Sequence, residues 1–274
     1  MKRRIPEGKT MAEQSRIPEE RLRGRVAVVT GAGRRAGIGA AICRALARRG
    51  ADVFFTQWGA YDRGPGTGED PEGPAALRQE LRSLDVRVEH AEADLSLPES
   101  PAQVLEEATE RLGVPSILVN NAAHSTRDGF ENLDSTTLDA HYVVNLRATA
   151  LLSVEFARRY PGGPGGRIIS MTSGQENGPM PGELAYAATK GAVAAFTRSL
   201  AVEVGPKGIT VNAVNPGPTD TGWMDEGLKR ELTPRFPLGR IGLPEDAARL
   251  VAWLATDEAG WITGQVIDSE GGFY

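Results

Sequence analysis

Residues 25–50, RVAVVTGAGRRAGIGAAICRALARRG, decide the fold of this chain. The run starts with apolar, β-branched residues that are typical of a buried strand, and it then passes through a glycine-rich turn. Apolar residues at helical spacing follow the turn. A strand, a glycine turn and a helix in this order begin a βαβ unit. The stretch therefore predicts a parallel sheet, with its first strand at 25–30 and its first helix at 38–49.

The same alternation of short apolar runs and helical patterns continues to the end of the chain. Strands are predicted at 51–56, 86–91, 116–120, 167–172, 209–215 and 265–269, and helices near 74–84, 99–112, 134–160, 183–204 and 244–256. Several strands are apolar on successive residues, as expected where helices cover both faces of a sheet. We predict an α/β fold, a single-domain, doubly wound (Rossmann) sheet of seven parallel strands over residues 23–274.

Three segments interrupt this pattern. Residues 1–22 are polar and are expected to form a mobile N-terminal arm. Residues 57–74, QWGAYDRGPGTGEDPEGP, are an insertion rich in glycine and proline after the second strand. Residues 216–243 separate the sixth strand from the next helix, include a short helical pattern near 225–232, and are interpreted as a lid over the substrate site.

Composition excludes several classes of function. The 274 residues carry a net charge of −5, which does not suit a nucleic-acid binder. Cys43 is the one cysteine and the three histidines, His90, His124 and His141, are scattered, so neither a disulfide framework nor a metal site is predicted. No signal peptide and no apolar run of ~18 residues is present, and we expect a cytoplasmic protein without a membrane segment.

The glycine turn predicts a dinucleotide site. Glycines between an apolar strand and an amphipathic helix let the backbone approach a pyrophosphate at the helix N-terminus, and the candidates are Gly31, Gly33, Gly37 and Gly39. The alternative is an ordinary tight turn.

Charge near this turn favours NADP(H) over NAD(H). The end of the second strand, FFTQW, has no carboxylate for the ribose hydroxyls, and Arg34 and Arg35 add positive charge that suits a 2′-phosphate. In the alternative, the arginines are exposed to solvent and Asp62 folds back from the insertion to the ribose.

Tyr186 and Lys190 are the candidate proton-transfer pair. They lie four residues apart in AYAATKGA, and helical neighbours at this spacing share a face. A nearby ammonium would favour the phenolate and lower the pKa of the tyrosine. Such a pair also occurs by chance on a solvated helix face, so its context has to decide.

That context resembles the short-chain dehydrogenase/reductase family from about residue 22 to 274. The resemblance rests on motifs in the family's order: TGAGRRAGIG, Asp94-Leu95, Asn120-Asn121-Ala122-Ala123, Asn145, Ser173 thirteen residues before Tyr186, and Asn215-Pro216-Gly217 with Thr219. Two departures concern the cofactor: five residues separate Gly31 from Gly37 where the family has three, and Ala123 replaces a glycine. Either the turn is two residues longer, or Gly33 takes the place of the first glycine.

The resemblance implies a role for each of four catalytic residues. Tyr186 is the general acid or base, Ser173 orients and polarises the substrate oxygen, Lys190 holds the ribose and lowers the tyrosine pKa, and Asn145 anchors a water. The implied cofactor-binding residues are Gly31, Gly33, Arg34, Arg35, Gly37, Ile38, Gly39, Asp94, Leu95, Asn121, Ala122, Tyr186, Lys190, Pro216, Gly217 and Thr219.

The predicted substrate is a medium-sized ketone or secondary alcohol. The general resemblance to 3-oxoacyl-acyl-carrier-protein reductases makes a 3-oxoacyl compound one candidate. The residues expected to face it are His124, Gln175, Met180, Trp223 and Met224. A cofactor-binding regulator without turnover and a lyase or epimerase on the same fold remain as alternatives.

A homodimer or homotetramer is also expected. The helical patterns at 134–160 and 183–204 have more apolar positions than one sheet face needs, and in the family such faces pair between subunits. The positions are Tyr142, Leu151, Phe156, Val193 and Phe196.

Overall fold

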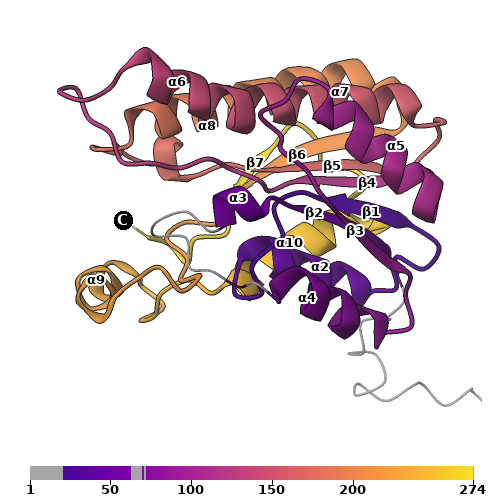
Figure 1. The fold of residues 1–274 in the computed structure, drawn as a ribbon, viewed down its shortest axis with the longest axis horizontal. Coiled ribbons are helices and arrows are strands. Elements are labelled where there is room, and N and C mark those ends of the chain that lie inside the picture. The colour runs from indigo at the N-terminus through magenta and orange to yellow at the C-terminus, as the bar shows by residue number, and fades with distance from the viewer. Residues whose placement is uncertain (1–20, 63–69, 71, 274) are drawn as a thin grey trace, which may run out of the picture.

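The computed structural model describes residues 21–62, 70 and 72–273, and shows one seven-stranded sheet (Figure 1). The strand order is β3-β2-β1-β4-β5-β6-β7, and every pair is parallel. The strands are β1 (Val26–Val29), β2 (Asp52–Gln57), β3 (Val88–Glu92), β4 (Ile117–Asn120), β5 (Gly166–Met171), β6 (Ile209–Asn215) and β7 (Val266–Asp268). All seven predicted strands are confirmed, with ends that shift by one or two residues.

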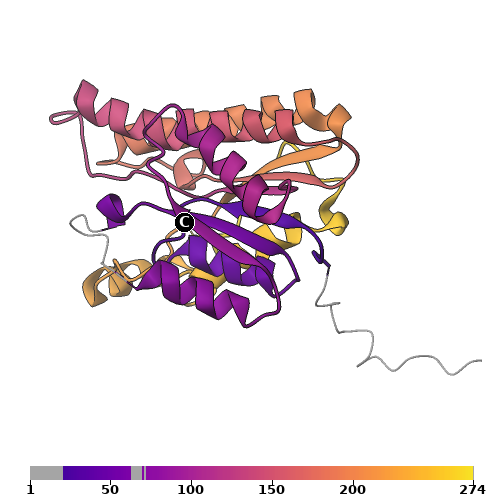
Figure 2. The same ribbon diagram turned by 45° about the vertical axis from the view of Figure 1, so that its right-hand side comes forward.

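Helices cover both faces of the sheet, as two layers in Figures 1 and 2. One layer holds α2 (Ile38–Ala47), α4 (Gly73–Arg82) and α10 (Pro244–Leu254), and the other holds α5 (Ser100–Leu112), α6 (Ser135–His141), α7 (Thr149–Arg159) and α8 (Leu184–Val204). Consecutive residues of β2 show why the strand is apolar throughout: Phe54 packs in one core and Phe55 in the other. The predicted doubly wound fold is confirmed.

Shorter helices lie in the connections. They are α3 (Gly59–Asp62), α9 (Glu226–Leu232), and the 3₁₀ turns η2 (Gly174–Glu176), η3 (Gly205–Lys207), η4 (Thr233–Arg235) and η5 (Asp257–Ala259). The short helix expected near 225–232 is α9, which begins at the Asp225 cap. Within the described residues, no helix combines the length and apolar character needed to cross a bilayer.

The helix predicted over 134–160 differs from the structure. It is divided into α6, a π-helical segment η1 (Tyr142–Ala148) and α7. The Asp134 side chain accepts a hydrogen bond from the Thr137 amide and starts α6. A π segment inserts an extra residue into the turn and often marks a functional position, and here it carries Asn145.

The domain begins earlier than predicted. Leu22 is fully buried, and its amide donates to the Arg49 carbonyl at 2.8 Å, so Arg21 and Leu22 belong to the fold instead of the arm. The rest of the expected arm, residues 1–20, lies outside the described residues. In the insertion at 57–74, α3 and the start of α4 are described, whereas 63–69 and 71 are not.

Candidate active site

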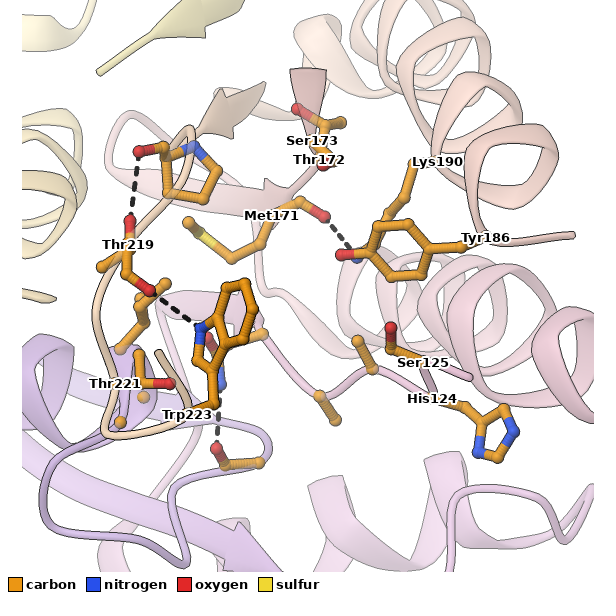
Figure 3. Close-up of a pocket in the computed structure, with 18 of the residues that line it drawn as sticks. His124, Ser125, Met171, Thr172, Ser173, Tyr186, Lys190, Thr219, Thr221 and Trp223 are labelled. Carbon is orange, nitrogen blue, oxygen red and sulfur yellow. Dashed lines mark hydrogen bonds between the residues drawn. The ribbon is translucent and has the colours of Figure 1, made fainter. Parts of the chain in front are cut away.

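A cavity of about 1,120 Å³ opens at the edge of the sheet where the strands end (Figure 3). The loops after β1, β2, β4, β5 and β6 contribute to it, together with the first turns of α8. In open α/β sheets, this edge beside the change in strand order is where ligands bind. Most predicted site residues line it: Gly31, Arg34, Gly37, Ile38, Gly39, Leu95, Asn121, Ala122, His124, Ser173, Met180, Tyr186, Lys190, Pro216, Gly217, Thr219 and Trp223.

The glycine turn is packed too closely for side chains at two positions. A Cβ placed on Gly39 would lie 2.5 Å from the Gly31 carbonyl oxygen, and one on Gly31 would lie 2.7 Å from the Ala122 Cα. Gly31 also has a positive φ of 71°. Gly33 faces the insertion, where a Cβ would overlap the Asp62 carboxylate. This arrangement favours a turn that is two residues longer than the family's, because Gly31 keeps its place.

Helix α2 presents its N-terminus to the cavity. Its cap is Gly37, which has no side-chain hydrogen bond to the helix, and its first turn has no acidic residue. Gly37, Ile38 and Gly39 all line the cavity. Amides and dipole at such a terminus suit a phosphate group, so the turn fits a dinucleotide.

Two further predicted cofactor residues, Arg35 and Asp94, do not line the cavity. Arg35 is held by Asp70 of the insertion: its Nε lies 2.9 Å from Oδ2, its Nη2 3.0 Å from Oδ1, and its amide also donates to Oδ2. This bond to Arg35 lowers the pKa of the Asp70 carboxyl. Asp94 is likewise used locally, because its Oδ1 accepts the Ser96 amide at 2.9 Å. Gly33 is likewise absent from the cavity wall, and a cofactor-binding role for these three residues stays a prediction.

Two predicted substrate residues also lie off the cavity wall. Met224 is buried within the 216–243 segment, and Gln175 lies in η2 with both side-chain amide atoms buried, so its amide does not reach the cavity. Thr219 shapes the start of the 216–243 segment, the predicted lid. Its hydroxyl donates to the Pro216 and Gly217 carbonyls, and its own carbonyl accepts the Trp223 indole N–H at 3.1 Å (Figure 3).

Lys190 and Tyr186 face the cavity from α8. The Lys190 Nζ donates to the Met171 carbonyl at 2.8 Å and lies 5.4 Å from the centroid of the Tyr186 ring (Figure 3). Burial lowers the pKa of Lys190 to about 8.

Burial also raises the pKa of Tyr186 well above its ordinary value, with a smaller contribution from Glu183, while a hydrogen bond with Ser173 acts in the opposite direction. Lys190 is not among the groups that shift this pKa here, so the lowering of the tyrosine pKa by Lys190 stays a prediction. Here the loss of solvent around the phenol outweighs the hydrogen bond with Ser173.

Asn145 stands behind the cavity wall. Its Oδ1 accepts the His124 amide at 2.7 Å, and its Nδ2 donates to the His124 carbonyl at 2.9 Å and to the Thr189 hydroxyl at 3.1 Å. The side chain thus fixes the loop after β4 against α8. The water-anchoring role stays a prediction.

His124 of this loop packs edge to face against His141, with ring centroids 4.7 Å apart. His141 is fully buried; its Nε2 accepts the Thr126 amide, so its Nδ1 carries the proton and donates to the Thr137 carbonyl. Burial and His141 together lower the pKa of His124. No group of metal-ligating side chains occurs in the part of the chain that the structure describes.

The chain is similar to known proteins over most of its length. A family model described as enoyl-(acyl carrier protein) reductase matches residues 31–274. The oxidoreductase YjdA of Bacillus subtilis is 53% identical over 251 residues, which cover 91% of this chain and 96% of the relative. The 3-oxoacyl-[acyl-carrier-protein] reductase FabG of Pseudomonas aeruginosa is 38% identical over 260 residues, covering 92% and 98%.

A solved structure is similar over the same range. It is a short chain dehydrogenase from Burkholderia cenocepacia in complex with NADP, with a TM-score of 0.83 and 34% identity over 92% of this chain and 99% of that one. The chain belongs to the short-chain dehydrogenase/reductase family. It is an oxidoreductase of this family, and the resemblance seen in its motifs is confirmed.

The motifs of the short-chain dehydrogenase/reductase family do not reveal every cavity residue. Tyr61 and Asp62 of α3 line the cavity from the insertion, and Arg235, Glu270 and Phe273 line it from the lid and the C-terminal loop. The position of the insertion after β2, at the ligand-binding edge, is the sequence signal that could have indicated Tyr61. No comparable signal marks Phe273, which reaches the cavity by packing against Arg235 and Phe236 of the lid.

Proposed function

We propose that this protein transfers a hydride between NADP(H) and the carbonyl carbon of a ketone, or the carbinol carbon of a secondary alcohol, with Tyr186 as general acid or base. The observation that carries the proposal is that Ser173, Tyr186 and Lys190 face one cavity together with the glycine turn and the open N-terminus of α2. Hydride transfer coupled to proton transfer needs a cofactor site beside an acid or base, and this arrangement supports that reading.

The cavity residues fit a dinucleotide. The residues that would hold it are the glycine turn, Asn121 and Ala122 after β4, Lys190, and the stretch from Pro216 to Thr219 after β6. When bound, the nicotinamide supplies or accepts the hydride. Support for NADP(H) comes from Arg34 on the cavity wall, from the absence of a carboxylate at the end of β2, and from the NADP bound by the Burkholderia relative. Asp62 beside Gly33 is the feature that argues for NAD(H).

The side chains of the protein handle the proton. In the reductive direction, the protonated Tyr186 phenol donates to the substrate oxygen while the Ser173 hydroxyl donates a hydrogen bond to the same atom. The Lys190 ammonium, held by the Met171 carbonyl, stabilises the phenolate that remains. In the oxidative direction, the Tyr186 phenolate takes the proton of the alcohol.

The side chains around Ser173 indicate which substrates the cavity can accept. Met180 contributes apolar surface with its Sδ 4.0 Å from the Ser173 Oγ, and Trp223 faces the cavity from the lid. His124 adds a polar ring on the opposite side. A 3-oxoacyl thioester is one candidate, supported by the name of the Pseudomonas relative. A cytoplasmic location and a homo-oligomeric state belong to the same proposal.

The decisive experiment is a panel of ketones, including a 3-oxoacyl thioester, tested by the loss of NADPH absorbance. We expect turnover of some of them, and a loss of at least about 100-fold in kcat for Tyr186→Phe. Tyr142→Phe is the matched control, because Tyr142 lies on η1 away from the cavity. Full activity of Tyr186→Phe would refute the role of the tyrosine. Conversion of substrate without net change in NADPH would point to a lyase or epimerase.

Cofactor preference is tested in the same assay. The ratio of kcat/KM for NADPH and NADH should favour NADPH, and Arg34→Ala should reduce that ratio. A clear preference of the wild-type protein for NADH would overturn the NADP(H) assignment.

A further inference from the structure

We propose that the helical turn α3, Gly59–Asp62, belongs to the dinucleotide site and retains the bound cofactor, with Tyr61 as the side chain that closes the cleft. The inference rests on the proposed function only in requiring that the cavity binds a dinucleotide. It assigns a binding role to the part of the insertion that follows β2.

Two consecutive side chains of α3 reach two different walls of the cavity. Asp62 lies against the glycine turn after β1, where its carboxylate covers the Cα of Gly33. Tyr61 lies against the loop after β4: its hydroxyl accepts the Ser125 amide at 3.2 Å, and its ring packs on His124 with centroids 5.7 Å apart. Both side chains also line the cavity. One turn of helix therefore connects both sides of the cleft.

The strand order makes this connection a bridge. Because β1 lies between β2 and β4, a segment that follows β2 can reach the loop after β4 only by crossing the end of β1. The glycine turn begins at that end. Figure 1 shows α3 at this edge of the sheet, between the two helical layers. A dinucleotide seated on the glycine turn would lie in the cleft that Tyr61 spans.

The loop that Tyr61 contacts, residues 124–126, is held on its other side by buried side chains. The three successive amides of the loop each donate to a side chain: His124 to Asn145, Ser125 to Tyr61, and Thr126 to His141. Asn145 and His141 are buried in the helical layer. Opening of the bridge must therefore come from the α3 side.

Tyr61 also extends toward the reacting end of the cavity. Its phenol is close enough to Tyr186 to contribute to the raised pKa of that residue. The bridge thus spans the cleft from the glycine turn to the surroundings of the proton-transfer group. A side chain in this place can slow the release of a cofactor without taking part in the chemistry.

The test measures cofactor release without any carbonyl substrate. NADPH bound to the full-length protein is displaced with excess NADP⁺ in a stopped-flow fluorimeter, and the dissociation constant is titrated separately. Loss of one hydrogen bond in Tyr61→Phe should speed release about 2- to 10-fold. Tyr61→Ala, which also removes the ring, should speed it by more than the phenylalanine variant. Tyr142→Phe and Tyr142→Ala are the matched controls and should leave release unchanged.

The outcomes separate this inference from the proposed function. Release from the Tyr61 variants at the wild-type rate, in a protein that still reduces a carbonyl, overturns the role of α3 alone. Faster release in a protein that turns over no carbonyl supports the role of α3 and overturns the proposed function. Thermal unfolding of each variant without cofactor checks the fold, and Tyr61→Phe, which keeps the ring, carries the test if Tyr61→Ala is unstable.

Discussion

At the residue scale, the protonation of Tyr186 sets the pH dependence of the two reaction directions. Burial raises its pKa above the ordinary tyrosine value, so the phenol is protonated throughout the neutral range. Reduction uses the protonated form, and its kcat/KM should be flat between about pH 6 and 8. Oxidation uses the phenolate, and its kcat/KM should rise about tenfold per pH unit up to at least about pH 9. Rate profiles in both directions check this.

A different pH profile would mean that burial does not control the pKa of Tyr186 in the working enzyme. If oxidation levels off near neutral pH, the phenolate forms there, and Lys190 would outweigh burial once the cofactor is bound. The profile of Lys190→Met distinguishes the two cases, since it would then lose the plateau.

Lys190 should make the folded protein less stable at neutral pH. The unfolded chain keeps an ordinary lysine, whereas burial lowers the folded-state pKa to about 8. Below pH 8 the folded protein must hold the charge in a buried site. As the pH rises from about 8 toward the ordinary lysine value of about 10.4, the folded form loses the proton while the unfolded chain retains it, so stability increases.

Lys190→Met removes the buried charge but also the hydrogen bond to the Met171 carbonyl. The net effect should be a rise of about 1–3 kcal/mol in the free energy of unfolding at pH 7. The difference should shrink toward pH 10. Urea unfolding at both pH values measures it. Lys229→Met, which breaks a surface pair with Asp220, should lower stability slightly and serves as the control. A less stable Lys190→Met protein at pH 7 would contradict the argument.

At the element scale, the sequence predicts strands better than the details of helices. Apolar runs such as 167–172 bury both faces and can only be central strands, so their positions were predicted within a residue or two. The π segment that carries Asn145 could not be predicted. Its hydrophobic spacing is close to that of an α-helix, and neither proline nor glycine marks it.

The π segment should be needed for the order of the loop after β4. Asn145→Ala leaves the amide and carbonyl of His124 without their side-chain partner, which should cost about 1–3 kcal/mol and speed hydrogen exchange at residues 124–126. Thr189→Val removes only the third contact of Asn145 and should have a smaller effect. Loss of turnover with unchanged exchange would show that Asn145 acts elsewhere, as in the predicted anchoring of a water.

The insertion shows a second limit of prediction. Its composition predicts a loop, but the pairing of Arg35 with Asp70 and of Tyr61 with Ser125 joins residues 35 and 64 positions apart. No local pattern carries this information. The local sequence favours Arg35 as a phosphate ligand because it does not show that Arg35 pairs with the Asp70 carboxylate of the insertion.

At the scale of the whole molecule, some apolar side chains that were expected at a subunit interface pack in the core of the chain instead. Phe156 and Val193 are buried in the core, so these two positions give no support to an interface. Tyr142 and Leu151 are exposed, as is Val202 on α8, at 79%. These three side chains belong to the layer formed by η1, α7 and α8 (Figure 1). Exposed apolar side chains on this layer are what the predicted association surface would need.

We therefore expect a dimer or tetramer that forms through the helical layer of η1, α7 and α8. The double variant Leu151→Glu and Val202→Glu places charge among the apolar groups that subunits would share, and it should give monomers in light scattering after gel filtration. Trp261→Glu is the control: Trp261 is more exposed than either residue, but it follows η5 outside this layer, and its loss should leave the dimer intact. A monomeric wild-type protein, or a dimer that survives the double variant, would show that this layer is not the interface.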